Sequence, residues 1–148
     1  MLRDALQVLF GTLLGLLGLA ALLCGVATVW WETPGLHVDT AGRAATAHME
    51  LLGEYPSNIR SIEILRDGSA APVWMIVADG DFFQIHAVSL VVGDNPVATK
   101  LFWGHARHLA PASGTTFRLD AGTGYRITIC PSALLGLCRT ASFTLRAR

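Results

Sequence analysis

The sequence predicts a mainly β protein that has a single N-terminal transmembrane helix followed by an antiparallel β-sandwich of about seven strands. The first 31 residues are strongly apolar, and from Ile59 onward short runs of β-favouring residues are separated by turn residues. Several of these runs alternate apolar with polar side chains. We expect a transmembrane anchor over 1–31, a linker over 32–58 and an extracytoplasmic domain over 59–148.

Composition limits the size of the protein and its partners. A chain of 148 residues has room for one domain and an appendage, and a hydrophobic fraction of 52% is high for a water-soluble protein. Lys+Arg and Asp+Glu number 11 each, so the net charge is zero, and basic residues form no cluster along the sequence. We therefore expect no nucleic-acid partner.

The apolar N-terminal segment predicts a membrane anchor. Ala5 to Val29 carries no charge, and at 1.5 Å per residue it would form a helix of roughly 37 Å, against about 30 Å for the hydrocarbon core of a bilayer. Trp30 and Trp31 follow, where indole rings favour the headgroup level. Arg3 gives the leading flank a weak positive bias, so we expect a bacterial inner-membrane protein whose C-terminal domain is periplasmic, with membrane lipid as a partner.

A cleaved signal peptide is the alternative interpretation of this segment. Gly25-Val26-Ala27 has the small-x-small form that signal peptidase accepts. The apolar run, however, is longer than the 7 to 15 residues usual for a signal peptide. The anchor is therefore favoured, and the alternative stays open.

Glycines form a stripe along the predicted membrane helix. Gly11, Gly15, Gly18 and Gly25 are spaced by four, three and seven residues, which places them on one helix face. In lipid, small residues allow two helix backbones to approach closely. The stripe predicts packing against the same helix of a second copy or against another membrane protein, although glycine is also common in membrane helices without such a role.

The segment between the anchor and Asn58 is predicted to be a linker, with a short helix from Ala41 to Leu52. Beyond it, the apolar pattern changes face within Phe83 to Val92, so we expect a bulge or a crossing between sheets near Ala87. The expected strands are Ser61 to Leu65, Val73 to Ala78, Phe83 to Val92, Ala98 to Trp103, Thr115 to Leu119, Tyr125 to Cys130 and Ala141 to Arg146.

The stretch "LDAGTGY", Leu119 to Tyr125, followed by the alternating "RITI", resembles the corner before the penultimate strand of fibronectin type III and related immunoglobulin-like domains. The resemblance covers about 30 residues, from Thr115 to the C-terminus. It implies an immunoglobulin-like sandwich in which the Tyr125 hydroxyl bonds to the backbone of the corner and Leu119 is its partner in the core. It implies nothing about function, because such sandwiches have many roles.

Cys130 and Cys138 flank the expected last hairpin. In an exported domain they are expected to pair. The loop between them is apolar, with Leu134, Leu135 and Leu137. It either folds over the open end of the sandwich to complete the core, or forms a contact surface for a partner or for the membrane.

Few residues in the sequence indicate chemistry. His105 and His108 lie three apart in an expected loop, a spacing that can serve two metal ligands, but no third ligand is evident nearby. Trp103, beside Phe102, could form a platform for a sugar or a partner, although a buried strand end is the commoner outcome. We expect no enzyme activity and no cofactor, with a metal-dependent enzyme as the least favoured reading.

These observations predict a non-catalytic binding or assembly subunit of an envelope membrane complex. The alternative is a freestanding periplasmic or secreted ligand-binding module that uses a loop such as Gly104 to Ser113.

Overall fold

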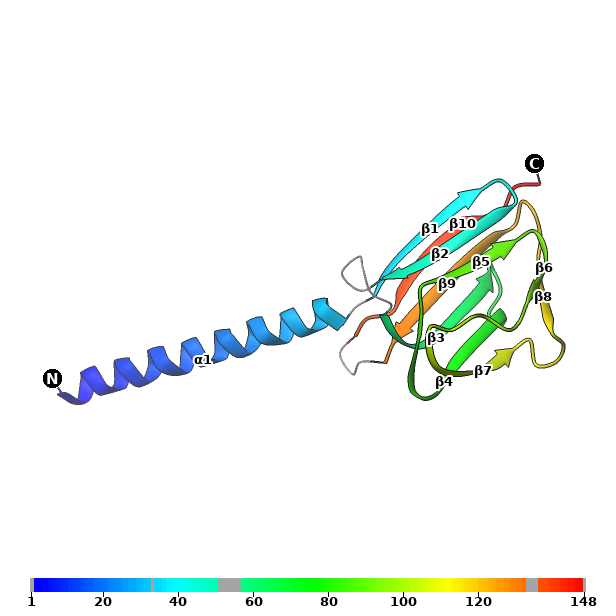
Figure 1. Ribbon diagram of the computed structural model, residues 1–148. Coiled ribbons are helices and arrows are strands. Elements are labelled where there is room, and N and C mark those ends of the chain that lie inside the picture. Colours follow the sequence, from blue (N-terminus) through cyan, green and yellow to red (C-terminus); the bar gives the residue numbers. More distant parts are fainter. Residues whose placement is uncertain (1, 33, 51–56, 133–135, 148) are drawn as a thin grey trace.

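The structure is a computed structural model that describes residues 2–32, 34–50, 57–132 and 136–147. These residues form one helix and ten strands, in place of the seven strands expected (Figure 1). The elements are α1 (Leu2–Glu32), β1 (Gly35–Ala41), β2 (Ala44–Glu50), β3 (Ser57–Arg66), β4 (Pro72–Ile85), β5 (Ala87–Val91), β6 (Gly93–Pro96), β7 (Trp103–Ala110), β8 (Thr116–Leu119), β9 (Gly124–Pro131) and β10 (Arg139–Thr144).

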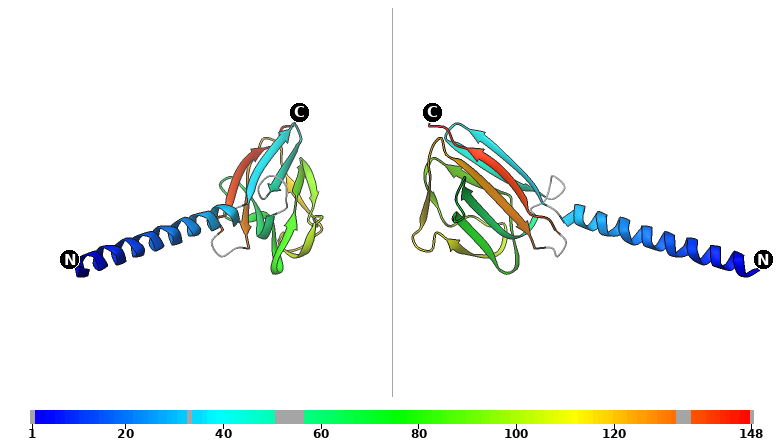
Figure 2. Two further views of the ribbon diagram at one scale, coloured as in Figure 1. Left: turned by 60° about the vertical axis from the view of Figure 1, so that its left-hand side comes forward. Right: turned by 180° about the vertical axis from the view of Figure 1, so that it is seen from behind.

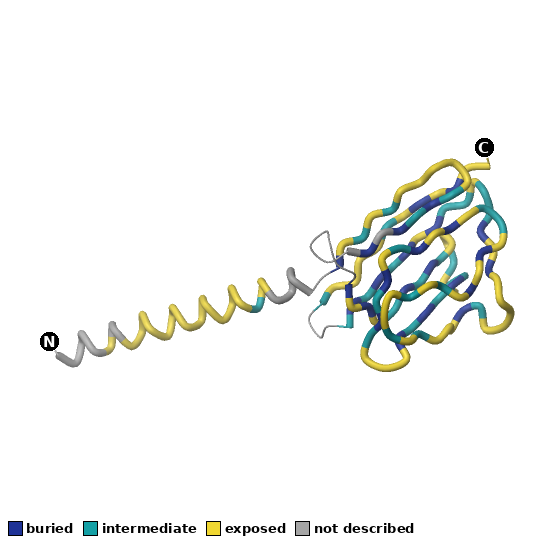
Figure 3. The backbone as a smooth tube through the Cα atoms, in the orientation of Figure 1, coloured by how far each residue is buried: buried dark blue, intermediate teal, exposed yellow. Residues whose placement is uncertain are grey.

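Helix α1 projects from the β domain, and its described apolar side chains between Phe10 and Val26 are exposed (Figure 3). None of the stretch Phe10–Ala27 is buried against the rest of the chain. This stretch is long and apolar enough to cross a membrane. A helix that is apolar all round is normally buried in a protein core or in lipid.

The first two strands correct the predicted linker. β1 and β2 form an antiparallel hairpin in which Gly35 pairs with Glu50 and Ala41 with Ala44, so the short helix expected from Ala41 to Leu52 is wrong over the described residues. Gly42, in the two-residue turn, has φ +59°, a conformation that glycine adopts without strain. The helix was predicted because the inward residues of β2 include two alanines. Alanine favours helix, and its small side chain weakens the apolar alternation that indicates a strand.

The strands form antiparallel sheets that share one core (Figure 2). A five-stranded sheet has the order β10-β9-β3-β4-β7, a three-stranded sheet has the order β1-β2-β5, and β6 pairs with β8. Buried side chains from all three sheets belong to a single cluster. Trp74, one of its largest members, donates its indole N–H to the carbonyl of Val97 at 2.9 Å and stacks on Phe117.

Strand β4 joins the predicted strand Val73 to Ala78 to the start of the predicted strand Phe83 to Val92, because the chain between them, with Asp79-Gly80, is an irregularity within one strand. Pairing with β7 jumps from Ala78–Ala106 to Phe83–Gly104, which leaves 79–82 outside the regular ladder. Gly80 there has φ +126°. The strand predicted from Ala98 to Trp103 is also wrong. Residues 98–102 are described but are not in a strand, and β7 begins only at Trp103.

The predicted change of sheet near Ala87 is confirmed. β4 ends at Ile85 in the five-stranded sheet, and β5 begins at Ala87 in the three-stranded sheet, where Ala87 pairs with His48. The crossing explains the change of apolar face, since Phe83 and Ile85 enter the core from one sheet and residues of β5 enter it from the other.

The corner before β9 has the geometry expected of Tyr125. Its hydroxyl accepts a hydrogen bond from the backbone N–H of Asp120 at 2.8 Å, and both Tyr125 and Leu119 are fully buried. The Tyr125 ring stacks on Phe143. The hydroxyl thereby satisfies a backbone donor at the turn between β8 and β9.

Replacing Tyr125 by Phe should destabilise the fold by about 1–3 kcal/mol, because it leaves the Asp120 N–H without its acceptor. Urea unfolding of the full chain in detergent, followed by tryptophan fluorescence, measures the loss. Thr140→Val is the matched control, since it also removes one hydroxyl, from an exposed Thr128–Thr140 bond, and should change stability by less than about 0.5 kcal/mol. Equal stability of Tyr125→Phe and wild type would contradict this role.

Candidate functional site

One end of the β domain lies next to the C-terminus of α1, and we call it the helix-side end (Figure 1). Only Thr33 and Pro34 separate α1 from β1, and Pro34 is buried. The starts of β1, β3 and β7 and the ends of β2, β4 and β9 meet here. The register pairs that define this end are Gly35–Glu50, Ser57–Ile85, Ile59–Pro131 and Gln84–Trp103.

Aromatic side chains gather at the helix-side end. Trp103 stacks on Phe82 with ring centroids 5.1 Å apart, and Phe102 meets the ring of His86 edge-on at 5.0 Å. Phe102, the residue before β7, donates its backbone N–H to the carbonyl of Gln84 at 2.7 Å. This bond holds Phe102 against β4. We call Phe82, His86, Phe102 and Trp103 the aromatic surface.

These rings are attached to β4 but remain open to solvent. Phe102 is 64% exposed and Trp103 is 58% exposed. The sequence left open whether Trp103 is a buried strand end or part of a platform, and the structure places it on the surface beside Phe82. Phe82 and His86 were not among the predicted site residues.

Gly104 allows β7 to approach β4 at this point. Its φ is +85°, and a Cβ atom there would lie 2.8 Å from the carbonyl oxygen of Phe82. Real Cβ atoms do not come so close to a backbone oxygen, so only glycine fits. The close approach brings the neighbouring Trp103 ring onto Phe82.

The disulfide-closed loop also lies at the helix-side end. Cys130 and Cys138 are bonded, as predicted, and Ser132 donates its backbone N–H to the carbonyl of Asn58. Leu137 is 59% exposed, so it does not complete the core. Leu134 and Leu135 lie outside the described residues.

The two candidate metal ligands occupy a strand, not the expected loop. His105 and His108 belong to β7, where residues three apart lie on opposite faces of the strand. The described residues contain no group of three or more His, Cys, Asp or Glu side chains that could hold a metal ion. The ligand-binding loop expected from Gly104 is likewise strand as far as Ala110.

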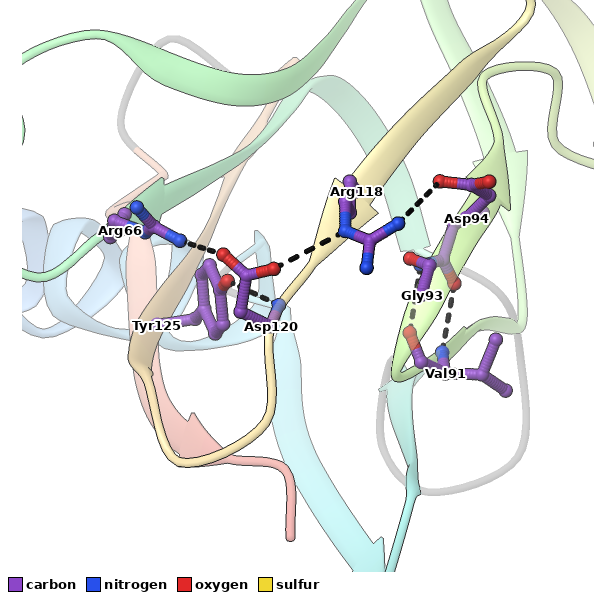
Figure 4. Close-up of polar contacts among 8 residues, drawn as sticks. Arg66, Val91, Gly93, Asp94, Arg118, Asp120 and Tyr125 are labelled. Carbon is purple, nitrogen blue, oxygen red and sulfur yellow. Dashed lines mark hydrogen bonds and ion pairs between the residues drawn. The ribbon is translucent and has the colours of Figure 1, made fainter. Parts of the chain in front are cut away.

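A network of charges surrounds the Tyr125 corner at the opposite end of the domain (Figure 4). Asp120 pairs with Arg66 and lies 3.4 Å from Arg118, which in turn lies 3.7 Å from Asp94. The Tyr125 hydroxyl, followed by the Asp120 carboxylate, raises the pKa of Arg66 above its usual value. An arginine is charged at neutral pH in any case, and the exposed network contributes to the corner only the small amount typical of surface ion pairs.

Asn95 bonds to the backbone at the same end of the domain, at Val91 and Gly93, which Figure 4 labels. Its buried side chain accepts the N–H of Val91 and donates to the carbonyls of Val91 and Gly93, at 2.8, 2.8 and 3.0 Å. These bonds satisfy backbone groups where β5 turns into β6. We interpret this end as structural.

Comparison with family models, with curated proteins and with solved structures gave no match. The sequence does contain a signal for Phe82, which was not predicted as a site residue. Phe82 and Phe83 are neighbours in one strand, so their side chains point to opposite faces, and with Phe83 buried Phe82 must point away from the core.

Replacing both Cys130 and Cys138 by Ser should reduce stability by about 2.5 kcal/mol, the chain-entropy value for so short a loop. Urea unfolding of the full chain measures the loss. Dithiothreitol should weaken the wild type by a similar amount and leave the double variant unchanged. A double variant as stable as the oxidised wild type would show that the bond does not stabilise the fold.

Proposed function

We propose that this chain is a single-pass protein of the bacterial inner membrane. In this proposal α1 anchors an extracytoplasmic, periplasmic β domain, which acts as a non-catalytic binding or assembly subunit of an envelope membrane complex. The observation that carries the proposal is the apolar stretch Phe10–Ala27, none of which is buried, in a helix that two residues join to a domain with its own core.

Exposure of α1 supports the anchor. Leu13, Leu14 and Leu19 each expose more than half of their surface, and they lie on different sides of the helix. Water-soluble monomers rarely expose so large an apolar area. Lipid or another membrane helix is the environment that fits it.

The proposal also assigns the β domain to the immunoglobulin-like sandwiches. Two features support this assignment: sheets that share one core, and the bond from the Asp120 N–H to the Tyr125 hydroxyl. Domains of this kind commonly present surfaces to partners, and the fold itself implies no catalysis.

Within the membrane, the glycine stripe is the proposed contact with a second copy or another membrane protein. A Cβ atom added at Gly11, Gly15 or Gly18 would meet no atom of the described chain within 4 Å. These positions therefore have no packing role inside the described chain that would explain glycine. An interhelical role is consistent with their spacing.

A freestanding periplasmic or secreted ligand-binding module is the second candidate. The exposed stack of Trp103 on Phe82 favours it, because exposed aromatic faces bind sugars and other flat ligands. Cleavage after Ala27 would support its secreted form, whereas the first proposal requires that α1 stay attached.

Arginine at both Leu16 and Leu19, in the middle of the apolar stretch, should release the protein from membranes. Each arginine costs about 2.5–3.5 kcal/mol at the centre of a membrane helix. Carbonate extraction measures the fraction that stays in the membrane pellet. The isoleucine double variant at the same positions is the control and should remain there, as should the wild type.

Mass spectrometry of the mature chain distinguishes the anchored protein from the secreted form of the second candidate. A wild-type protein that carbonate releases, or a mature chain that begins at Thr28, would refute the anchor and support the secreted module.

Gly15→Leu should weaken helix association in the membrane, because the larger side chain separates backbones that must approach closely. Ala20→Leu is the matched control, since it adds a leucine on the opposite helix face. Cross-linking in native membranes, with capture of copies of this chain or of a partner, measures the effect. The stripe has no such role if both variants cross-link as the wild type does.

A further inference from the structure

We infer that the helix-side end docks on the lipid headgroups, with Phe102, Trp103 and Leu137 as the side chains that touch them. This inference rests on the proposed anchoring by α1. It assigns a lipid-contacting role to the aromatic surface and to Leu137.

Exposure singles out this end of the domain. Outside α1, the large hydrophobic side chains that the described structure leaves exposed are Phe102 at 64%, Leu137 at 59%, Trp103 at 58%, Leu109 at 47% and Val91 at 44%. The three most exposed all lie at the helix-side end. They come from two segments far apart in the sequence, β7 with the residue before it and the disulfide-closed loop.

The connection to α1 holds this end close to the bilayer. Glu32 and Gly35 are three residue steps apart, which an extended chain spans in at most about 11 Å. The headgroup layer beyond the hydrocarbon core is roughly 5–8 Å thick on each side. A domain held so closely to the end of a membrane helix has its helix-side end within reach of the headgroups.

The chemistry of the surface fits lipid headgroups. Tryptophan has an apolar body and an N–H that can bond to water or to lipid oxygens, which is why it gathers at membrane interfaces. The sequence already places Trp30 and Trp31 at the end of α1. Trp103 adds an indole from the folded domain at the same side.

The surface is also built to keep its shape. Phe82 supports one face of Trp103, and Gly104 permits the close approach that creates this stack. The Cys130–Cys138 bond restrains the loop that carries Leu137. Rigid rings that are already exposed lose little conformational entropy on contact.

Quenching of tryptophan fluorescence tests the inference on the full chain in phosphatidylcholine nanodiscs. Some of the lipids carry a nitroxide on the headgroup, which quenches a tryptophan that it touches. Replacing Trp30 and Trp31 by Phe leaves Trp74, which is buried, and Trp103. Emission from Trp103 should then lose most of its intensity when the nitroxide is present.

A tryptophan further along β7 is the matched control. In the chain with Trp30 and Trp31 replaced by Phe, the further changes Trp103→Phe and Leu109→Trp move the exposed indole six residues along the strand, roughly 20 Å away. We expect little quenching there. Circular dichroism checks that each variant keeps its β structure.

The Trp103→Phe chain that retains Trp30 and Trp31 tests the anchor separately. If its emission is quenched while Trp103 is not, the anchor stands and the docking inference is overturned. Equal quenching at positions 103 and 109 also overturns it, since lipid contact would then not be confined to the helix-side end. If Trp30 and Trp31 are not quenched, both the anchor and the inference fail.

Discussion

The two residues between α1 and β1 are the constraint on which the organisation of this chain depends. They are too few to let the β domain diffuse away from the end of the helix. Because β1 starts at this point, strand pairing then determines which other segments lie near the helix. The sheet register, more than the sequence order, decides which surface the helix-side end presents.

This constraint gives the two ends of the β domain different characters. At the far end, side chains satisfy backbone groups: Tyr125 accepts from the Asp120 N–H, and Asn95 bonds to Val91 and Gly93. At the helix-side end, large apolar side chains remain exposed. Exposed apolar area opposes solubility. These exposed side chains lie at the same end of the domain as the apolar helix α1, so the proposed membrane would cover the helix and the side chains together.

Much of the fold could be predicted where local chemistry determines it. The corner at Tyr125, the change of sheet at Ala87 and the Cys130–Cys138 pair each depend on residues within a short stretch. The hairpin of β1 and β2 could not be predicted in this way. Its buried positions include Ala45 and Ala47, alanine is found in helices and in strands, and only the folded core shows that these two side chains point inward. The break expected between Ala78 and Phe83 is wrong for a related reason, since Asp79-Gly80 suits both a turn between strands and a bulge within one.

The aromatic surface shows why the site was harder to predict than the fold. Trp103 could be identified as a candidate, but its partner Phe82 is 21 positions away and becomes a neighbour only through the pairing of β4 with β7. That pairing is irregular at 79–82, so simple alternation does not give its register. The requirement for glycine at position 104 follows from the same irregularity, because the close approach exists only in the folded sheet. Features that depend on long-range register therefore need the structure, and here they are the ones on which the proposed contact with lipid headgroups depends.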